Sequence, residues 1–364
     1  MPRTEHPRVE HADHPISGAG SVSRTSAQPQ PPTGVEVLVP GAPGAPVVLI
    51  TECDHDTFDA EIAVARQAGV ELRLAQARTT EELITAAAGA AGLVVQYAEI
   101  SAAVLDALPE LQVVSRYGVG VDSVDVAAAA ARGVTVCNVP DYGTEAVSDH
   151  AIALALTASR GVARLDRGVR AGRFDLQAVR PVGQVRGSVF GVVGVGRIGH
   201  ATALKARGLG YEVLGFDVLA PDADGELHGV PVAPLDEVLR RADVVSLHTP
   251  LTAATHHLVG RRELALMKPT AVLVNTSRGG VVDTDALVAA LGEGRLRAAG
   301  IDVHEEEPVP AGHPLTRLEN VTLTPHLAWY TEESYTELKR RTVENAVEAI
   351  AGRVPRNVVT EETR

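Results

Sequence analysis

Cysteine and tryptophan are scarce in this sequence. The 364 residues include two cysteines, Cys53 and Cys137, which lie far apart and outside any CxxC spacing, and one tryptophan. This pattern indicates neither a disulfide framework nor a zinc site, so we expect no metal site. Such a low cysteine content fits a reducing compartment, and we expect a cytoplasmic protein.

Long apolar runs and an excess of positive charge are also missing. No segment reaches the ~18 consecutive apolar residues of a membrane span, and the N-terminus has charged and His residues where a signal peptide would have an apolar core. Acidic residues outnumber Lys and Arg by 46 to 33, giving a formal net charge of −13. Because nucleic acids and anionic membranes attract clustered Lys and Arg, we expect neither partner.

The length predicts two domains, since 364 residues exceed what one hydrophobic core usually organises. Residues 1–45 are rich in Pro, Ser, Gln and charge, and we expect a disordered leader there. Short apolar runs then alternate with amphipathic segments, which is typical of βα units around a parallel sheet. The strands of this first domain are expected at residues 47–50, 70–74, 92–96, 113–115 and 134–137.

A second series of strands follows a long helix, which we expect over residues 144–160 with Thr144 as its N-cap. Six apolar runs with helical segments between them match the doubly wound dinucleotide-binding fold. A last amphipathic helix is expected over residues 331–351. The six strands are expected at residues 189–193, 212–216, 244–247, 271–274, 298–301 and 321–323.

The stretch Gly194-Val-Gly-Arg-Ile-Gly199 has the glycine spacing of a nucleotide-phosphate loop. The first glycine permits a tight turn, the second lets a pyrophosphate approach the backbone, and the third lets helix pack on strand. The stretch follows an apolar strand, opens a helix and precedes a second strand that ends in Asp217. This acid should accept hydrogen bonds from the adenosine ribose, which favours NAD over NADP. The alternative is a structural turn in which Asp217 caps a loop.

Ligands of open parallel sheets bind beyond the carboxyl ends of the strands, so polar residues at these ends are candidates for the site. The acidic run Glu305–Glu307 follows one such end. The residues that we expect to contact the cofactor are Gly194, Gly196, Arg197, Ile198, Gly199, Asp217, His248, Thr249, Pro250, Thr255, Thr276, Ser277, Arg278, Asp302 and His326.

Two of these side chains suggest a reaction. The planar guanidinium of Arg278 suits a carboxylate, and beside a nicotinamide it would orient a 2-oxo or 2-hydroxy acid. Its alternative is a structural ion pair near Asp283 or Asp285. His326 can donate a proton to a carbonyl oxygen as hydride reaches the adjacent carbon, whereas its alternative is a core histidine. A carboxylate bonded to this imidazole would fix its tautomer. We favour Glu307, although spacing does not separate it from its two neighbours.

These residues closely resemble the D-isomer-specific 2-hydroxyacid dehydrogenases, which include phosphoglycerate dehydrogenase, D-lactate dehydrogenase and the C-terminal-binding-protein (CtBP) corepressors. The resemblance covers residues 47–360. It rests on the Gly194 loop with Asp217 and on Arg116-Tyr-Gly-Val-Gly-Val-Asp122, His248-Thr-Pro-Leu251, Asn275-Thr-Ser-Arg-Gly279, Asp302-Val-His-Glu-Glu-Glu-Pro308 and Thr324-Pro-His326.

The resemblance implies an α/β protein with two doubly wound parallel-sheet domains. A Rossmann NAD-binding domain of residues 144–330 would be inserted in a flavodoxin-like substrate-binding domain of residues 46–143 and 331–364. It also implies a homodimer, formed through the long helix that begins near Thr144. Hinge closure between the domains would exclude water from the active site.

The resemblance further implies a catalytic set of Arg278, Glu307 and His326, which settles the choice among the three glutamates. Backbone N–H groups of Val119 and Gly120 would help to hold the substrate carboxylate. The residues expected to bind substrate are Tyr97, Val119, Gly120, Arg278, His326 and Trp329.

Three departures from the family pattern carry information. His304 stands where an aromatic or apolar residue is usual, and the sequence lacks the regulatory domain of long phosphoglycerate dehydrogenases, so we expect no serine feedback. Pro325-His-Leu-Ala-Trp-Tyr330, with Asn138-Val-Pro-Asp-Tyr-Gly143, looks most like the CtBP branch. Trp329 would then line an apolar substrate pocket; alternatively it packs against the final helix.

Two functions are compatible with this sequence. The first is an NAD-dependent oxidoreductase that interconverts a 2-oxo acid and a D-2-hydroxy acid, with His326 as acid and base. The second is a CtBP-like NAD(H)-sensing interaction protein, or corepressor, with little turnover. The complete catalytic set and the lack of a basic DNA-reading segment favour the enzyme. A formate dehydrogenase is disfavoured, because that branch pairs its histidine with glutamine.

Overall fold

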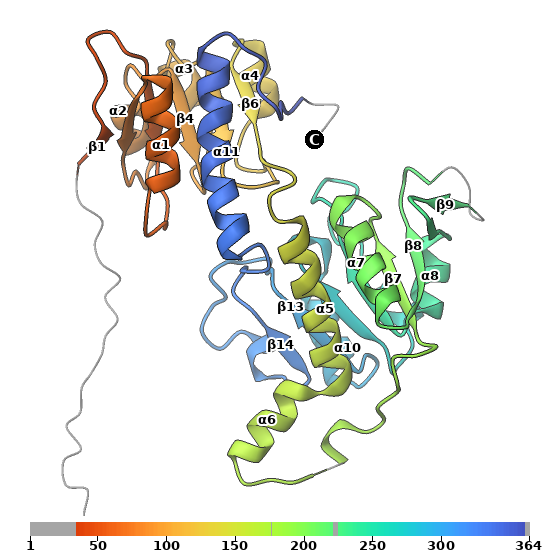
Figure 1. Cartoon of the computed structure of the whole chain (residues 1–364). Coiled ribbons are helices and arrows are strands. Elements are labelled where there is room, and N and C mark those ends of the chain that lie inside the picture. The colour runs from red at the N-terminus through yellow and green to blue at the C-terminus, as the bar shows by residue number, and fades with distance from the viewer. Residues whose placement is uncertain (1–33, 176, 221–224, 361–364) are drawn as a thin grey trace, which may run out of the picture.

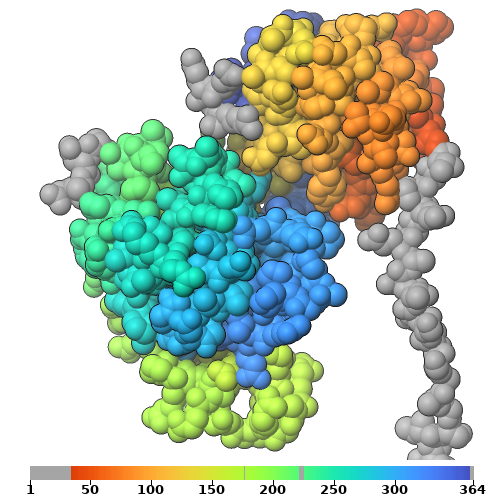
Figure 2. Space-filling view, turned by 180° about the vertical axis from the view of Figure 1, so that it is seen from behind, coloured from red at the N-terminus to blue at the C-terminus, as the bar shows by residue number. Residues whose placement is uncertain are grey.

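The computed structural model describes residues 34–175, 177–220 and 225–360. Two lobes are visible, each built around a mainly parallel sheet with helices on both faces (Figure 1). Figure 2 shows the same two lobes from behind, as separate masses joined by a narrower region. Most of the leader expected at residues 1–45, namely residues 1–33, lies outside the described residues, as do residues 361–364.

The sheet of the first lobe has the order β1-β3-β2-β4-β5-β6. Its last five strands in this order are parallel, whereas β1 pairs antiparallel with β3 at the edge. The strands are β1 (Glu36–Val39), β2 (Val47–Ile50), β3 (Glu71–Leu74), β4 (Gly92–Val95), β5 (Val113–Arg116) and β6 (Thr135–Cys137). Every strand expected for this domain is present, to within one residue at either end.

The expectation of a disordered leader up to residue 45 is wrong for β1. This four-residue strand completes the sheet edge and buries Val39 against the core, while its first two residues stay exposed. Apolar periodicity does not reveal this strand, because the run between Gly34 and Pro40 is too short to show a period. The hydrogen bonds of the strand come from its pairing with β3.

Helices from both ends of the chain cover this first sheet. Its helices are α1 (Asp59–Ala68), α2 (Thr80–Ala86), α3 (Ala102–Ala107), α4 (Val126–Ala131) and α11 (Glu332–Ile350). One apolar core lies under α2, α3 and α4, and a second lies under α1 and α11 on the opposite face. Figure 1 shows α11 beside α1. The C-terminal helix therefore returns to the lobe in which the chain begins.

The sheet of the second lobe has the order β14-β13-β12-β11-β7-β8, with all strands parallel. Its strands are β7 (Val189–Val193), β8 (Glu212–Phe216), β11 (Val244–Leu247), β12 (Val272–Asn275), β13 (Ala298–Ile301) and β14 (Val321–Leu323). A separate hairpin joins β9 (Glu226–Leu227) to β10 (Val230–Pro231). The chain runs outward in one direction from β7 to β8 and in the other from β11 onward. The loops after β7 and β11 therefore diverge, which opens a crevice at their carboxyl ends.

Helices also cover both faces of the second sheet. They are α5 (Thr144–Arg160), α7 (Arg197–Gly208), α8 (Leu235–Arg241), α9 (Arg261–Leu266) and α10 (Thr284–Gly292). The helix α6 (Val162–Arg170) follows α5 and has no buried residue, and the 3₁₀ helices are η1 (Gln177–Val179), η2 (Gly279–Val281) and η3 (Pro314–Arg317). One core lies under α5 and α7, and the other lies under α9 and α10. No helix among the residues that the structure describes is long and apolar enough to cross a membrane.

The N-cap expected at Thr144 is one residue too late. Gly143 holds the N-cap position of α5 without any side-chain capping bond, and Thr144 is the first helical residue. The turn between β6 and α5 packs closely here, because a Cβ at Gly143 would lie 3.8 Å from the Trp329 side chain. The start of the helix is set by the backbone geometry of this turn, which cannot be read from a capping motif in the sequence.

Candidate active site at the crevice between the lobes

The glycine loop has the shape that a dinucleotide phosphate needs. Gly194 has φ 90°, and a Cβ there would lie 2.7 Å from the His248 carbonyl oxygen. A Cβ at Gly199 would lie 1.9 Å from the Gly194 carbonyl oxygen, whereas a Cβ at Gly196 would meet no atom within 4 Å. The first and third glycines are thus required by close packing, and the second faces open space. The N-terminus of α7 lies beside that space and offers free N–H groups to an anion.

Asp217 follows β8 at the same edge of the sheet and is half-buried. Its Oδ2 accepts a hydrogen bond from the Val195 N–H at 2.8 Å, and its Oδ1 accepts one from the Leu219 N–H at 2.9 Å. The carboxylate therefore ties the glycine loop to the end of β8. Since a carboxylate offers about four lone-pair sites, it keeps the capacity to accept from a ribose as well.

Two buried hydroxyl groups point to a missing polar partner. Thr249 Oγ1 and Thr276 Oγ1, just beyond β11 and β12, are buried without a hydrogen bond to any described residue. Buried polar atoms are normally paired, so a bound ligand with polar atoms would satisfy them. Together with the glycine cradle, these hydroxyls fit a dinucleotide.

Other residues expected at the cofactor are engaged elsewhere in this structure. The Ser277 hydroxyl donates to Asn275 Oδ1 at 2.8 Å, and the Thr255 hydroxyl donates to the Pro250 carbonyl at 2.6 Å. The His248 ring turns to Ser246 Oγ at 2.9 Å, and burial lowers the pKa of His248 to about 3. Its neutral imidazole therefore packs inward, while only its backbone borders the glycine loop.

Asp302 is fully buried and holds the segment that carries His326. Its carboxylate accepts hydrogen bonds from the Leu327 N–H at 3.1 Å and the Ala328 N–H at 2.9 Å, and its carbonyl accepts from the His326 N–H at 2.8 Å. His326 has φ 55°, an uncommon conformation for a residue with a side chain. The buried acid thus stabilises an unusual backbone at a candidate catalytic residue.

His326 and Glu307 lie in direct contact. The Nδ1 atom of His326 is 2.7 Å from Glu307 Oε2, and the His304 N–H donates to Glu307 Oε1 at 2.8 Å. Although burial alone would raise the pKa of Glu307, the hydrogen bonds from His326 and His304 hold it below its usual value. With Glu307 ionised, Nδ1 carries the proton and Nε2 is left for a ligand.

The structure separates the three glutamates that spacing alone did not. Glu305 contacts His257, with 2.7 Å between Oε1 and Nε2, and Glu307 contacts His326. The His326 side chain is 40% exposed, so a small molecule in the crevice could reach it.

Arg278 reaches from the second lobe to the first. Its Nε donates to Asp122 Oδ2 at 3.2 Å, and a Cβ at Gly120 would lie 2.0 Å from its Nη2. The expected alternative, an ion pair with Asp283 or Asp285, is not formed, and Asp283 instead caps α10 by accepting from the Ala286 N–H. The guanidinium therefore lies against the backbone of residues 118–122, where the Val119 and Gly120 N–H groups were expected to hold a carboxylate.

Sequence reasoning assigned no role to Arg116, although its motif was noticed. This residue ends β5, and a Cβ at Gly118 would lie 1.7 Å from its Nη1. Burial and the positive charge of Arg278 lower the pKa of Arg116. Two guanidinium groups thus gather near one loop, an arrangement that favours an anionic ligand. The signal in the sequence was the arginine two residues before a glycine required by close packing.

Tyr97 lies on a loop that the half-buried carboxylate of Glu52 organises. Glu52 Oε1 accepts hydrogen bonds from the backbone N–H groups of Gln96 at 3.1 Å and Ala98 at 2.8 Å, and from that of Tyr97. The Tyr97 hydroxyl donates to Asp54 Oδ2 at 3.2 Å, and its ring is exposed. The loop is therefore held from within while its aromatic side chain remains free to meet a ligand.

Trp329 packs against the final helix. Its ring lies 5.9 Å from that of Tyr335 in α11 and 6.3 Å from that of Tyr142, measured between centroids. Its Nε1 donates to the His326 carbonyl at 3.0 Å. The structure therefore shows the expected alternative, in which Trp329 packs against the final helix. The hydrogen bond to the His326 carbonyl also places the indole beside His326.

A phosphate cradle at the switch point of a parallel sheet, with an imidazole–carboxylate pair and an arginine on loops at the same carboxyl edge, defines a dinucleotide-dependent oxidoreductase of small acids. A family model described as the NAD-binding domain of D-isomer specific 2-hydroxyacid dehydrogenases matches residues 152–328. A glyoxylate reductase of Korarchaeum cryptofilum is 44% identical over 72% of this chain and 80% of that protein.

A D-3-phosphoglycerate dehydrogenase of Methanocaldococcus jannaschii is 37% identical over 86% of this chain, which spans 59% of that relative. Among solved structures, D-lactate dehydrogenase with NAD⁺ from Lactobacillus jensenii has a TM-score of 0.71 and 27% identity, covering 86% of this chain and 99% of that chain. The chain belongs to the D-isomer-specific 2-hydroxyacid dehydrogenase family. The expected fold, NAD cofactor and enzyme class are confirmed.

Proposed function

We propose that this protein reduces a small 2-oxo acid to the D-2-hydroxy acid, and reverses the reaction, with Arg278, Glu307 and His326 as the catalytic set. The observation that carries the proposal is the 2.7 Å contact between His326 Nδ1 and Glu307 Oε2. It lies on the same lobe as Arg278, whose guanidinium meets the first lobe at residues 118–122. When bound, NAD supplies or accepts the hydride.

Arg278 orients the substrate through its carboxylate. Its planar fork donates two parallel hydrogen bonds to a carboxylate, and the N–H groups of Val119 and Gly120 complete the grip. Arg116 adds a second positive charge beside them. Asp122 pairs with Arg278 at 3.2 Å in this structure, and the substrate carboxylate replaces Asp122 as the partner of Arg278.

His326 transfers the proton. Its Nε2 donates to the carbonyl oxygen of the 2-oxo acid during reduction and accepts a proton from the hydroxyl in the reverse reaction. Glu307 keeps the proton on Nδ1 and balances the positive charge of the imidazolium. Because His326 binds the carbonyl oxygen of the substrate while Arg278 holds its carboxylate, the carbonyl carbon is presented in a single orientation.

We also propose how the remaining expected residues act. Asp217 accepts hydrogen bonds from the adenosine ribose, and the hydroxyls of Thr249 and Thr276 form hydrogen bonds with the cofactor. Tyr97 and Trp329 border the side chain of the substrate. The similarity to a glyoxylate reductase favours glyoxylate as one substrate. The partly buried indole favours larger apolar 2-oxo acids as others.

The finer expectations are part of this proposal. The CtBP-like placement rests on Pro325–Tyr330 and 138–143, and the cytoplasmic location rests on two buried free cysteines. The homodimer was expected through the helix that begins near Thr144, but α5 buries seven of its residues within the second lobe, so we place the dimer contact on α6, which follows α5 and has no buried residue. Its apolar side chains Val162, Leu165 and Val169 are exposed, as is Phe174 just beyond it.

The test is turnover of a panel of 2-oxo acids with NADH by the native protein and by His326→Ala and Arg278→Ala. We expect at least one good substrate and a loss in kcat/KM of ~10²- to 10⁴-fold in each variant. His228→Asn, in which Asn tolerates the positive φ of this position, and Arg132→Ala, both at exposed sites outside the proposed catalytic set, are the matched controls and should leave turnover unchanged. No turnover of any acid by the native protein would favour the NAD(H)-sensing alternative instead.

A further inference from the structure

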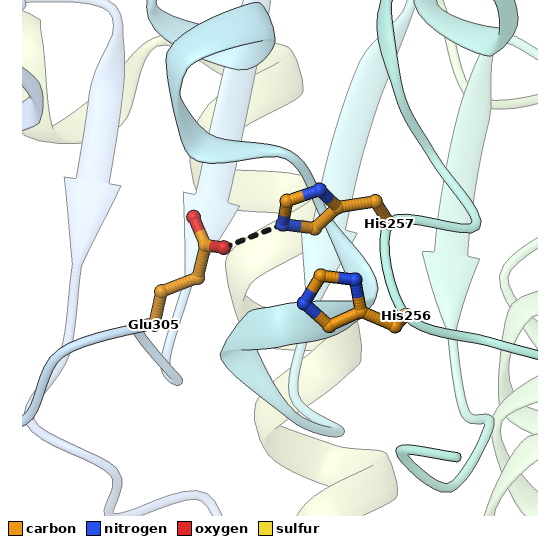
Figure 3. Close-up of side chains that lie close together, drawn as sticks. All are labelled: His256, His257 and Glu305. Carbon is orange, nitrogen blue, oxygen red and sulfur yellow. Dashed lines mark hydrogen bonds and ion pairs between the residues drawn. The ribbon is translucent and has the colours of Figure 1, made fainter. Parts of the chain in front are cut away.

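Among the described residues, one group of three potential metal ligands lies outside the proposed catalytic set. The group consists of His256, His257 and Glu305, whose ligand atoms all lie within 4.8 Å of one another. In Figure 3 both imidazoles lie beside the Glu305 carboxylate. The two rings stack with centroids 3.9 Å apart, and all three residues are exposed at the surface.

The fold holds two of these side chains in place. His257 has φ 52°, and its N–H donates to the Gly280 carbonyl at 2.8 Å. Glu305 accepts the Thr284 N–H at its Oε2, so its Oε1 is turned to His257 Nε2 at 2.7 Å. Side chains that are fixed by their own backbone and neighbours lose little entropy when they bind an ion.

The chemistry of the group suits a divalent transition metal. Two imidazole nitrogens and one carboxylate oxygen are ligands that Zn²⁺, Co²⁺ and Ni²⁺ prefer, whereas Ca²⁺ and Mg²⁺ prefer oxygen alone. Ligands at ~2.1 Å from a tetrahedral ion lie about 3.4 Å apart, so the side chains need only small rotations.

The three ligands come from segments that also carry the proposed catalytic residues. His256 and His257 belong to the loop after β11, which contacts η2 at Gly280, two residues beyond Arg278. Glu305 lies two residues before Glu307. A bound ion would therefore link the segment of Arg278 to the segment of Glu307 from outside the crevice.

We propose that His256, His257 and Glu305 form a surface site for a divalent transition metal, with Zn²⁺ as the probe of choice, and that the bound ion stabilises the loops behind the active site. The expectation of no metal site rested on cysteine spacing, which does not detect ligands that folding gathers from separate loops. The alternative is a simple ion pair between His257 and Glu305, which would not involve His256. Weaker Zn²⁺ binding in the His256 variant therefore distinguishes the metal site from the ion pair.

The experiment is calorimetric titration of ZnCl₂ into the untagged, full-length protein freed of metal by a chelator. Variants are His256→Ala and His257→Asn, the latter because Asn tolerates a positive φ. His228→Asn, at another position with positive φ, is the matched control. His6, His11 and His14 near the N-terminus remain in every protein, so the differences report on this group alone.

We expect a saturable Zn²⁺ site in the native protein and in His228→Asn, and at least ~10-fold weaker binding in His256→Ala and His257→Asn. Thermal unfolding should shift upward with Zn²⁺ in the native protein and not in the two ligand variants. Co²⁺ should give a visible absorption band that the same variants lose. Equal affinity in all four proteins, or no saturable binding by the native protein, overturns the proposal.

Discussion

The pair of Glu307 and His326 shows how a role depends on more than residue type. Three successive glutamates occupy positions 305–307, and their side chains diverge because Glu305 contacts His257 while Glu307 contacts His326. Spacing could not make this choice, and only the family resemblance favoured Glu307. Arg116 was missed for a different reason. The role of its motif had been assigned to the backbone N–H groups of Val119 and Gly120, so the arginine side chain received no role.

Glu307→Gln tests the positioning role at the residue scale. A neutral amide cannot hold Nδ1 in one protonation state or balance the imidazolium, so kcat/KM for the best 2-oxo acid should fall by ~10²- to 10⁴-fold with KM little changed. Steady-state kinetics with NADH measures this. Glu306→Gln, an exposed neighbour in the same run, is the control. Equal activity of the two variants would remove Glu307 from the mechanism.

Asp217 should set the choice of cofactor. A carboxylate at this position accepts from the ribose hydroxyls and repels a 2′-phosphate, so kcat/KM for NADH should exceed that for NADPH by about 10-fold or more. Asp217→Ala should narrow this ratio. Because Asp217 also binds the Val195 N–H, circular dichroism must show that the variant stays folded. A preference for NADPH in the native protein contradicts the assignment.

At the scale of elements, apolar periodicity predicted every strand of both sheets except the edge strand β1 and the small β9–β10 hairpin. Buried strands such as β4 and β12 are continuous apolar runs, and such runs are readable because both faces of a parallel sheet are covered. Edge strands and caps depend on tertiary contacts instead. This explains why the sequence did not predict β1, and why the expected start of α5 was one residue too late.

Asp141 joins elements that are far apart in the chain. Its carboxylate accepts from Arg341 in α11 at 2.6 Å and from Arg356 at 3.0 Å. Although burial would raise it, these two arginines hold the pKa of Asp141 below its usual value. The ionised form therefore contributes stability above about pH 4, and this contribution is lost as the pH falls through the lowered pKa of the folded state.

Asp141→Asn should thus lower the free energy of unfolding by about 1 kcal/mol at pH 7, and by less near pH 3. Urea unfolding at the two pH values measures the difference. Asp166→Asn, which breaks an exposed pair with Arg170, should leave the free energy of unfolding nearly unchanged at either pH. A cost that is independent of pH would show that the ion pairs are not its source.

At the scale of the molecule, the first lobe is built from both ends of the chain and the second from its middle. The helix α11 closes the core of the first lobe against α1, and the glycine loop for the cofactor lies in the second lobe. The phosphate motif therefore falls in the middle of the sequence. Arg278 lies in direct contact with the 118–122 loop and therefore joins the two lobes.

The surface of α6 should determine the oligomeric state. Leu165→Asp with Val169→Asp places charges on the exposed apolar side chains of α6, the helix that projects at the end of the second lobe in Figure 1. Light scattering should give twice the chain mass for the native protein and the monomer mass for the double variant. Val354→Asp, at an exposed position near the C-terminus, is the control and should remain dimeric. A monomeric native protein contradicts the homodimer.

The most direct test of the central claim is a crystal structure of the complex with NAD⁺ and oxamate, an unreactive mimic of a 2-oxo acid. The account predicts the oxamate carboxylate on the Arg278 guanidinium and on the Val119 and Gly120 N–H groups, with its amide oxygen about 3 Å from His326 Nε2. Glu307 should still bind Nδ1. An oxamate carboxylate bound away from Arg278, or a His326 ring turned away from the amide oxygen, would contradict it.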